Sequence, residues 1–217
     1  MADKICFLVV IIVSYLIGSM NASVVISKIL GDDIRNHGSG NAGATNMLRT
    51  YGKKMAVLAL VIDMLKGVIA ASLALLVKFI LNKNGIDTYF TDGFKYVAAL
   101  FAVLGHNYPV FFSFKGGKGI ATSGAVMFVL DWRVGLVVLI GAVLVMALTK
   151  IVSLGSLVGA VLYVVGPLFF IYVIDKEPNF WFVIVTVIMA ALAVIRHRAN
   201  IVRIIKGTES KIGDKAK

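Results

Sequence analysis

The sequence predicts an all-α integral membrane protein with seven transmembrane helices, one of them short. Of its 217 residues, 59% are hydrophobic and 15% are charged, and its mean hydropathy is +0.94. Soluble domains are nearer to about 45–50% hydrophobic and about 25% charged. The hydrophobic residues also gather in runs, and six of these reach or exceed the roughly 17 residues that cross a bilayer core of about 30 Å. These observations exclude an ordinary soluble domain.

Each hydrophobic run predicts a helix, because the runs are continuous rather than alternating and lipid cannot satisfy an open backbone. Seven spans of about 20 residues leave about ten residues for each connection. Residues 1–217 are therefore expected to form a single polytopic membrane domain. The expected spans are 5–30, 55–81, 93–112, 120–130, 133–149, 154–174 and 179–196.

Two of these runs admit another interpretation. The first could be a cleaved signal peptide, but Met20 interrupts the small-residue cleavage pattern before Ala22 and apolar sequence continues to Leu30, which favours a retained helix. The run 120–130 covers only about 16 Å and could be re-entrant. Re-entry would move the seven basic residues from Arg196 onward to the outer side, against the positive-inside rule. We therefore expect a crossing helix that begins inside the membrane.

The positive charges set the expected orientation. The chain carries 22 Lys and Arg against 11 Asp and Glu. Fifteen of the 22 fall on the side that receives residues 31–54, 113–119, 150–153 and 197–217, including Lys215 and Lys217; six fall on the other side, and Lys66 lies within a span. The positive-inside rule makes the first side cytoplasmic and places the N-terminus outside. Basic loops beside anionic lipid account for the net charge of +11 without a nucleic-acid partner.

The unusual polar residues are confined to this cytoplasmic side. They comprise three histidines (His37, His106 and His197) and two glycine-rich segments. A transporter usually carries polar residues near the midplane and on both sides, and often internal repeats; this chain concentrates its polar residues at one interface and shows no repeat. The only cysteine, Cys6, lies in an apolar run, which excludes a disulfide framework and a thiolate metal cluster. The pattern favours a ligand site at the cytoplasmic interface.

The first glycine-rich segment covers residues 38–52, with the sequence GSGNAGATNMLRTYG. Glycines let the backbone approach a ligand and present its N–H groups, and the fork of Arg49 suits phosphate or carboxylate. A flexible linker is the alternative, but this polar composition favours a binding loop. Its short hydrogen-bonding side chains are Ser39, Asn41, Thr45 and Asn46.

The second segment covers residues 105–124, with the sequence GHNYPVFFSFKGGKGIATSG. Lys118 lies among Gly116, Gly117 and Gly119 just before the short helix, whose free amides and dipole favour an anion. Thr122 in the first helical turn supports this interpretation. It is not a nucleotide P-loop, because glycine follows the lysine. A basic turn with helix-breaking glycines is the alternative.

The third segment covers residues 196–209, RHRANIVRIIKGTE, and is typical of a helix at the lipid headgroups. His197 and Asn200 are three residues apart and share one helical face. A basic interfacial tail is the alternative.

Further polar side chains are predicted inside the spans. Asp63 and Lys66 are three residues apart in the second span; intramembrane charges suggest function, but an opposite pair can also neutralise itself. Ser153 and Ser156 open the sixth span and are expected to point inward, where such residues often bond only to neighbouring helices.

In order and spacing, the three segments resemble the three cytoplasmic motifs of the bacterial membrane acyl-phosphate:glycerol-3-phosphate acyltransferases. Minor matches are YLIGSMNAS, DMLKG and SLGS, so the resemblance covers almost the whole chain. Met20 and Asn21 depart from the small apolar pair usual in the family. The resemblance implies a seven-helix enzyme of the bacterial inner membrane that transfers a fatty acyl group from acyl phosphate to the 1-hydroxyl of glycerol 3-phosphate. The implied products are lysophosphatidate and inorganic phosphate, with no cofactor and no metal.

The resemblance also implies roles for individual residues. Arg49 and Lys118 would hold a phosphate group, and Asn200 and His197 would orient the acceptor hydroxyl. Ser39 would join Lys118, Asn200 and His197 as a catalytic residue. The other implied substrate-binding residues are Asn41, Thr45, Asn46, Gly116, Gly117, Gly119, Thr122, Ser153, Ser156 and Glu209.

The expected partners are acyl phosphate, glycerol 3-phosphate and membrane lipid, and the protein is expected to be a monomer. The glycerolipid acyltransferases that use a His followed five residues later by Asp are excluded, because no histidine here has that neighbour. A membrane phosphatase would usually add a carboxylate cluster for metal, which the cytoplasmic loops do not offer. A transporter of organic phosphates remains the non-enzyme alternative.

Overall fold

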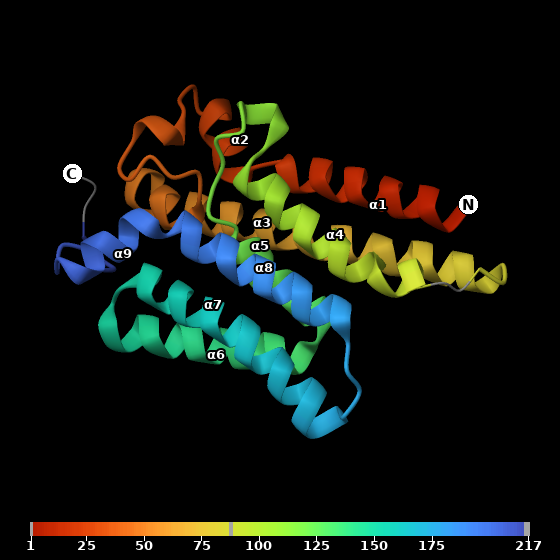
Figure 1. Ribbon diagram of the computed structural model, residues 1–217. Coiled ribbons are helices and arrows are strands. Elements are labelled where there is room, and N and C mark those ends of the chain that lie inside the picture. The colour runs from red at the N-terminus through yellow and green to blue at the C-terminus, as the bar shows by residue number, and fades with distance from the viewer. Residues whose placement is uncertain (1, 87–88, 215–217) are drawn as a thin grey trace.

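The computed structural model describes residues 2–86 and 89–214, and all regular structure in these ranges is helical. Lys215 and Lys217, which were counted on the cytoplasmic side, lie outside the described residues. The longer helices run roughly along one direction in Figure 1, with connections at the two ends. The α-helices are α1 (Ala2–Ser19), α2 (Ala22–Ile29), α3 (Ala44–Lys83), α4 (Tyr89–Asn107), α5 (Ile120–Leu130), α6 (Trp132–Thr149), α7 (Val152–Phe169), α8 (Phe180–Arg196) and α9 (Arg198–Ile205). Short 3₁₀ turns η1 (Ile34–Asn36) and η2 (Val110–Phe112) and a π-helical segment η3 (Phe170–Asp175) complete the described elements.

The first hydrophobic run is broken rather than continuous. α1 ends at Ser19, and Asn21 has extended backbone angles. The Oδ1 atom of Asn21 accepts a hydrogen bond from the Val24 N–H (3.1 Å), which makes Asn21 the N-cap of α2. The prediction of one helix through residues 5–30 is therefore wrong, because the asparagine side chain offers the backbone a new helix start.

α3 is longer than the span predicted within it. It begins at Ala44, inside the first glycine-rich segment, and is kinked at Gly52, whose φ of 79° is open to glycine at little cost. The short run 120–130 is a helix with the predicted bounds. Gly119 precedes it with φ of 77°, so the glycine lets the chain turn sharply into α5.

Within the described ranges, four helical segments are long and apolar enough to cross a membrane: Ala2–Ser19, Ala44–Lys83, Trp132–Thr149 and Val152–Asp175. A fifth results if α8 and α9, which are bent by 59° with respect to each other, count as one span. Helix α4 falls outside that set, and α5 is a shorter apolar helix. The count of seven crossings stays a prediction.

The helices pack as two connected groups that meet at α5 and α8. α1 packs against α4, and α3 packs against α4 and α5, whereas α6, α7 and α8 pack in sequence. At Gly18 an added Cβ would overlap the Ala102 carbonyl, so α1 and α4 approach at the backbone, as small residues permit in membrane helices. The connections at the start of α3 and of α5 lie with α9 at one end of the bundle (Figure 1). We call this the cavity end.

Candidate active site

A cavity of about 560 Å³ is lined by residues from all three polar segments. Its walls come from the start of α3, the start of α5, the facing ends of α6 and α7, and α9 with the tail behind it. Of the predicted site residues, those that line it are Ser39, Asn41, Thr45, Asn46, Arg49, Lys118, Gly119, Ser153, Ser156, His197, Asn200 and Glu209. The fold thus brings together segments that are up to 170 residues apart, from Ser39 to Glu209.

Lys118 projects toward α9. Its Nζ donates a hydrogen bond to Asn200 Oδ1 (2.5 Å). Burial, together with repulsion from Arg203, Arg196 and Arg49, lowers the pKa of Lys118 to about 8, against the attraction of Glu209. The ammonium is therefore mostly charged at neutral pH and only partly solvated, which favours a strong interaction with an anion.

Glu209 links the tail to α7 and α9. Its Oε1 accepts hydrogen bonds from Ser153 Oγ (2.7 Å) and Asn200 Nδ2 (2.5 Å), and its Oε2 accepts one from Arg203 Nε (2.6 Å). Burial alone would raise the pKa of Glu209, but these donors hold it below its usual range. Asn200 thus accepts from Lys118 and donates to Glu209, and its amide orientation is fixed from both sides.

His197 lies at the bend between α8 and α9 and is 2% exposed. Its Nδ1 is 2.7 Å from the Ala193 carbonyl, which can only accept, so Nδ1 carries the proton. Burial, with the positive charge of Lys118 nearby, lowers the pKa of His197 to about 4. The ring is neutral at pH 7, with its Nε2 left as the acceptor.

Asn46 holds the first glycine-rich loop in shape. Its Nδ2 donates to the carbonyls of Ile34 (3.1 Å) and His37 (2.9 Å), and its Oδ1 accepts from the Ser39 N–H (3.1 Å). The amide is only 1% exposed. Although Asn46 reaches the cavity wall, its hydrogen-bonding groups are used within the loop.

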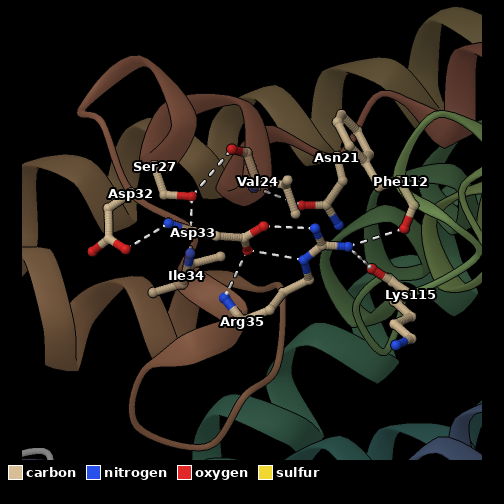
Figure 2. Close-up of polar contacts among 9 residues, drawn as sticks. All are labelled: Asn21, Val24, Ser27, Asp32, Asp33, Ile34, Arg35, Phe112 and Lys115. Carbon is tan, nitrogen blue, oxygen red and sulfur yellow. Dashed lines mark hydrogen bonds and ion pairs between the residues drawn. The ribbon is translucent and has the colours of Figure 1, made fainter.

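Arg35, just before the first glycine-rich segment, connects this part of the chain to the second glycine-rich segment (Figure 2). Its guanidinium makes two bonds to the Asp33 carboxylate, with Nε at 2.9 Å from Oδ1 and Nη2 at 2.6 Å from Oδ2. Its Nη1 donates to the carbonyls of Phe112 (2.9 Å) and Lys115 (3.3 Å). The Arg35 side chain thus fixes the chain just before the GGKG sequence.

Gly116, Gly117 and Thr122 do not line the cavity. The Arg196 guanidinium donates to the carbonyls of Gly116 (3.1 Å) and Gly117 (3.0 Å), and the Gly117 N–H donates to the His106 carbonyl (3.1 Å). Thr122 is fully buried, and its hydroxyl donates to the Asp63 carbonyl (2.9 Å). The geometry makes these three residues supports of the wall that carries Lys118.

Sequence reasoning gave no site role to several residues that line the cavity. Arg203 was counted only among basic tail residues, yet it faces the cavity with Asn200 and binds Glu209. Its position three residues after Asn200, itself three after His197, was the available signal. Asp63 and His106 also line the cavity, although neither was assigned to a site; the remaining polar lining residues without a predicted role are Lys53 and Ser210.

The cavity has an apolar part as well as a charged one. Val57 and Leu60 on α3 face it together with Met146 on α6 and Val152 on α7. The rise from Lys53 to Leu60 is about 10 Å at 1.5 Å per residue. The same cavity therefore offers cations and a wall suited to a hydrocarbon chain. Within residues 2–86 and 89–214, no three His, Cys, Asp or Glu side chains come together as a metal site.

Comparison of the whole chain with known proteins shows the family to which it belongs. The family model described as "Glycerol-3-phosphate acyltransferase" matches residues 8–207. A glycerol-3-phosphate acyltransferase of Clostridioides difficile is 42% identical over 212 residues, with 96% of this chain and 97% of the relative covered. One of Neisseria gonorrhoeae is 42% identical over 205 residues, covering 94% of this chain and 96% of the relative.

Two solved structures have the same architecture. Both are crystal structures of PlsY (YgiH), described as an integral membrane glycerol 3-phosphate acyltransferase, and each covers 96% of both chains. The glycerol 3-phosphate form is 36% identical with a TM-score of 0.80, and the lysophosphatidic acid form is 35% identical with a TM-score of 0.76. The chain described here is a member of the glycerol-3-phosphate acyltransferase family.

Proposed function

We propose that this protein transfers a fatty acyl group from acyl phosphate to the 1-hydroxyl of sn-glycerol 3-phosphate, giving lysophosphatidate and inorganic phosphate. The observation that carries the proposal is the cavity itself, in which phosphate-binding cations and an apolar wall face one space. A relative of the same fold was solved with glycerol 3-phosphate and with lysophosphatidic acid. An acyl phosphate combines the two properties of the cavity, because a charged head is joined to a hydrocarbon chain.

The donor is proposed to lie with its phosphate near the start of α5 and its chain along the apolar wall. Lys118 supplies a point charge there, and the residues after Gly119 present backbone N–H groups at a helix N-terminus. Arg49 supplies a second cation for either phosphate, while Ser39 and Asn41 supply hydrogen bonds from the first loop. In this proposal, Gly116 and Gly117 act through the shape of the loop.

The reaction needs little from the protein beyond positioning and charge stabilisation. The acceptor oxygen bonds to the acyl carbon, the bond from that carbon to the phosphate oxygen breaks, and phosphate departs. Asn200 and His197 are proposed to orient the hydroxyl, with Ser153, Ser156 and Glu209 as further contacts to the acceptor; Glu209 also accepts hydrogen bonds from Asn200 and Ser153. The low pKa of His197 makes it a weak base, so we assign the hydroxyl proton to a substrate phosphate oxygen, without metal or cofactor.

The membrane arrangement is part of the proposal. Seven crossings, with α5 as the short one, place the N-terminus outside and put the cavity end at the cytoplasmic face of a bacterial inner membrane. The basic residues at the cavity end support this orientation. Residues 1–217 are proposed to act as a single domain and as a monomer.

The test is phosphate release by the purified protein in detergent or lipid, with palmitoyl phosphate and with or without glycerol 3-phosphate. We expect release that requires glycerol 3-phosphate, equals lysophosphatidate formed and persists with a chelator present. Release without the acceptor would indicate a phosphatase instead. Folded protein that releases no phosphate would contradict the proposal and favour a transporter of organic phosphates.

A further inference from the structure

Three ionisable side chains meet beneath the cavity, inside the helix bundle. Lys66 Nζ lies 2.8 Å from Asp63 Oδ1 and 2.9 Å from His106 Nδ1, and the His106 Nδ1 atom is 3.5 Å from Asp63 Oδ1. None of the three is more than 5% exposed. A lysine ammonium only donates, so Nδ1 of His106 is the acceptor. We call Asp63, Lys66 and His106 the buried triad.

The buried triad holds the break between α1 and α2. Lys66 Nζ donates to the Met20 carbonyl (3.1 Å), and the Ala22 N–H donates to Asp63 Oδ1 (3.3 Å). These backbone groups are left without helical partners where the chain breaks. Asn21, between them, donates from Nδ2 to the Ala42 carbonyl in the first glycine-rich loop (3.1 Å). The triad thereby fixes the point from which that loop is held.

The buried triad also touches the second loop and the start of α5. The His106 carbonyl accepts from the Gly117 N–H (3.1 Å). An added Cβ at Gly117 would overlap His106 Nε2 and come within 2.6 Å of the Ala42 carbonyl, so both loops and the imidazole are in close contact there. Thr122 in α5 donates to the backbone carbonyl of Asp63 (2.9 Å). The second loop and the start of α5 therefore contact His106 and Asp63 directly, and the first loop is linked to the triad through Asn21.

A contribution to folding stability does not explain why these three ionisable side chains are buried together. A buried ion pair often contributes no net stability, because the cost of removing both charges from water cancels their attraction. Charges within a membrane protein are expensive for the same reason. The triad instead fixes the relative position of segments. Lys66 and Asp63 bond to backbone groups at the α1–α2 break, and His106 contacts the loop that carries Lys118.

We propose that the buried triad is a positioning cluster that sets the two glycine-rich loops against each other and so places Lys118 for substrate phosphate. This inference rests on the proposed function, because its readout is turnover of glycerol 3-phosphate. Asp63 and His106 line the cavity, but the assigned role is exerted through the loops and not on the reacting atoms.

The first test compares His106→Asn with His106→Leu. These replacements are close in shape and both remove the ring, but asparagine keeps an acceptor near the position of Nδ1. We expect the KM for glycerol 3-phosphate to be at least about tenfold higher in the Leu variant than in the Asn variant, as for loss of a hydrogen bond to a charged group. Equal KM values in two folded variants would overturn the proposal.

The second test removes both charges at once, with Asp63→Asn and Lys66→Met in one chain, so that no single buried charge is left unpaired. The control is Lys78→Met with Asp92→Asn, an ion pair of 2.6 Å that joins the far end of α3 to the start of α4. We expect kcat/KM for glycerol 3-phosphate to fall at least about tenfold in the first double variant and to stay unchanged in the control.

The readouts separate positioning from folding. Melting midpoint and elution profile report whether each variant is folded, and kinetic constants are taken only from folded protein. Folded Asp63→Asn/Lys66→Met protein with wild-type kcat/KM would overturn the proposal, as would an equal loss in the control. If the wild-type protein shows no glycerol 3-phosphate-dependent turnover, the proposed function is wrong. The positioning role, which depends on that function, is then wrong as well.

Discussion

The two ends of the helix bundle use the same charged residue types in different ways. At the end opposite the cavity, the Arg133 Nη2 atom lies 2.7 Å from Asp131 Oδ2 and 2.6 Å from Asp175 Oδ2, and Lys78 pairs with Asp92. These pairs are partly exposed, and in them two cations face three carboxylates. At the cavity end, the lining carries cations in excess: Arg49, Lys53, Lys118 and Arg203 against Asp63 and Glu209.

The difference shows which charged side chains are available to bind an anionic ligand. The charge of an exposed cation beside a carboxylate is largely neutralised, so the cation attracts a further anion only weakly. Such pairs also contribute little to stability. A half-buried cation that is held by a neutral amide, as Lys118 is held by Asn200, keeps most of its charge for an incoming anion. The following predictions test this contrast, from the largest expected effect to the smallest.

Replacement of Lys118 by alanine should nearly abolish acyl transfer. Loss of a preorganised charged donor costs on the order of 10²- to 10³-fold in rate, and phosphate binding is lost with it. The measurement is lysophosphatidate formation by purified protein, with the melting midpoint as the check on folding. Near-normal turnover in folded Lys118→Ala protein would show that the cavity is not the site.

Turnover should fall at alkaline pH as Lys118 loses its proton. The ammonium is present below its pKa of about 8 and lost above it, so kcat/KM for glycerol 3-phosphate should decrease about tenfold per pH unit above that value. Lys118→Arg should remove this decrease, because guanidinium stays charged. A profile that is flat to pH 10 in the wild-type protein would contradict a role for the Lys118 charge.

Glu209→Gln should reduce kcat/KM by about tenfold, because the glutamine has no charge to hold the Arg203 guanidinium and its amide group can oppose it. Loss of the carboxylate also removes an attraction that raises the pKa of Lys118. The alkaline decrease should therefore begin at a lower pH than in the wild-type protein. A pH profile that coincides with the wild-type profile would show that Glu209 does not act on Lys118.

Arg133→Gln at the opposite end should change neither kcat nor KM. The guanidinium is in contact with water and with two carboxylates, so its loss should move the melting midpoint only slightly. Enzyme assays and thermal unfolding on the same preparation check both statements. A large loss of turnover would mean that the two ends of the bundle are coupled.

How far the sequence predicted the fold depended on the kind of signal. Helix α5 was predicted with the observed bounds, because glycines precede it and Asp131 follows it. The break at Asn21 was missed, since hydropathy reports burial in lipid and not the capping bond from Val24. Arg203 was missed as a site residue because its partner, Glu209, lies on the tail that folds back beside it.

The sequence by itself determined the helical membrane class, the family and most of the polar side chains around the cavity. Those properties follow from local composition and from motifs of fixed spacing. Only the tertiary structure decided that Asn46 serves its own loop, that Arg196 holds Gly116 and Gly117, and that Asp63, Lys66 and His106 meet. The physical reason is that hydrogen bonds and charge pairs depend on the distance and direction between atoms, and packing of distant segments sets both.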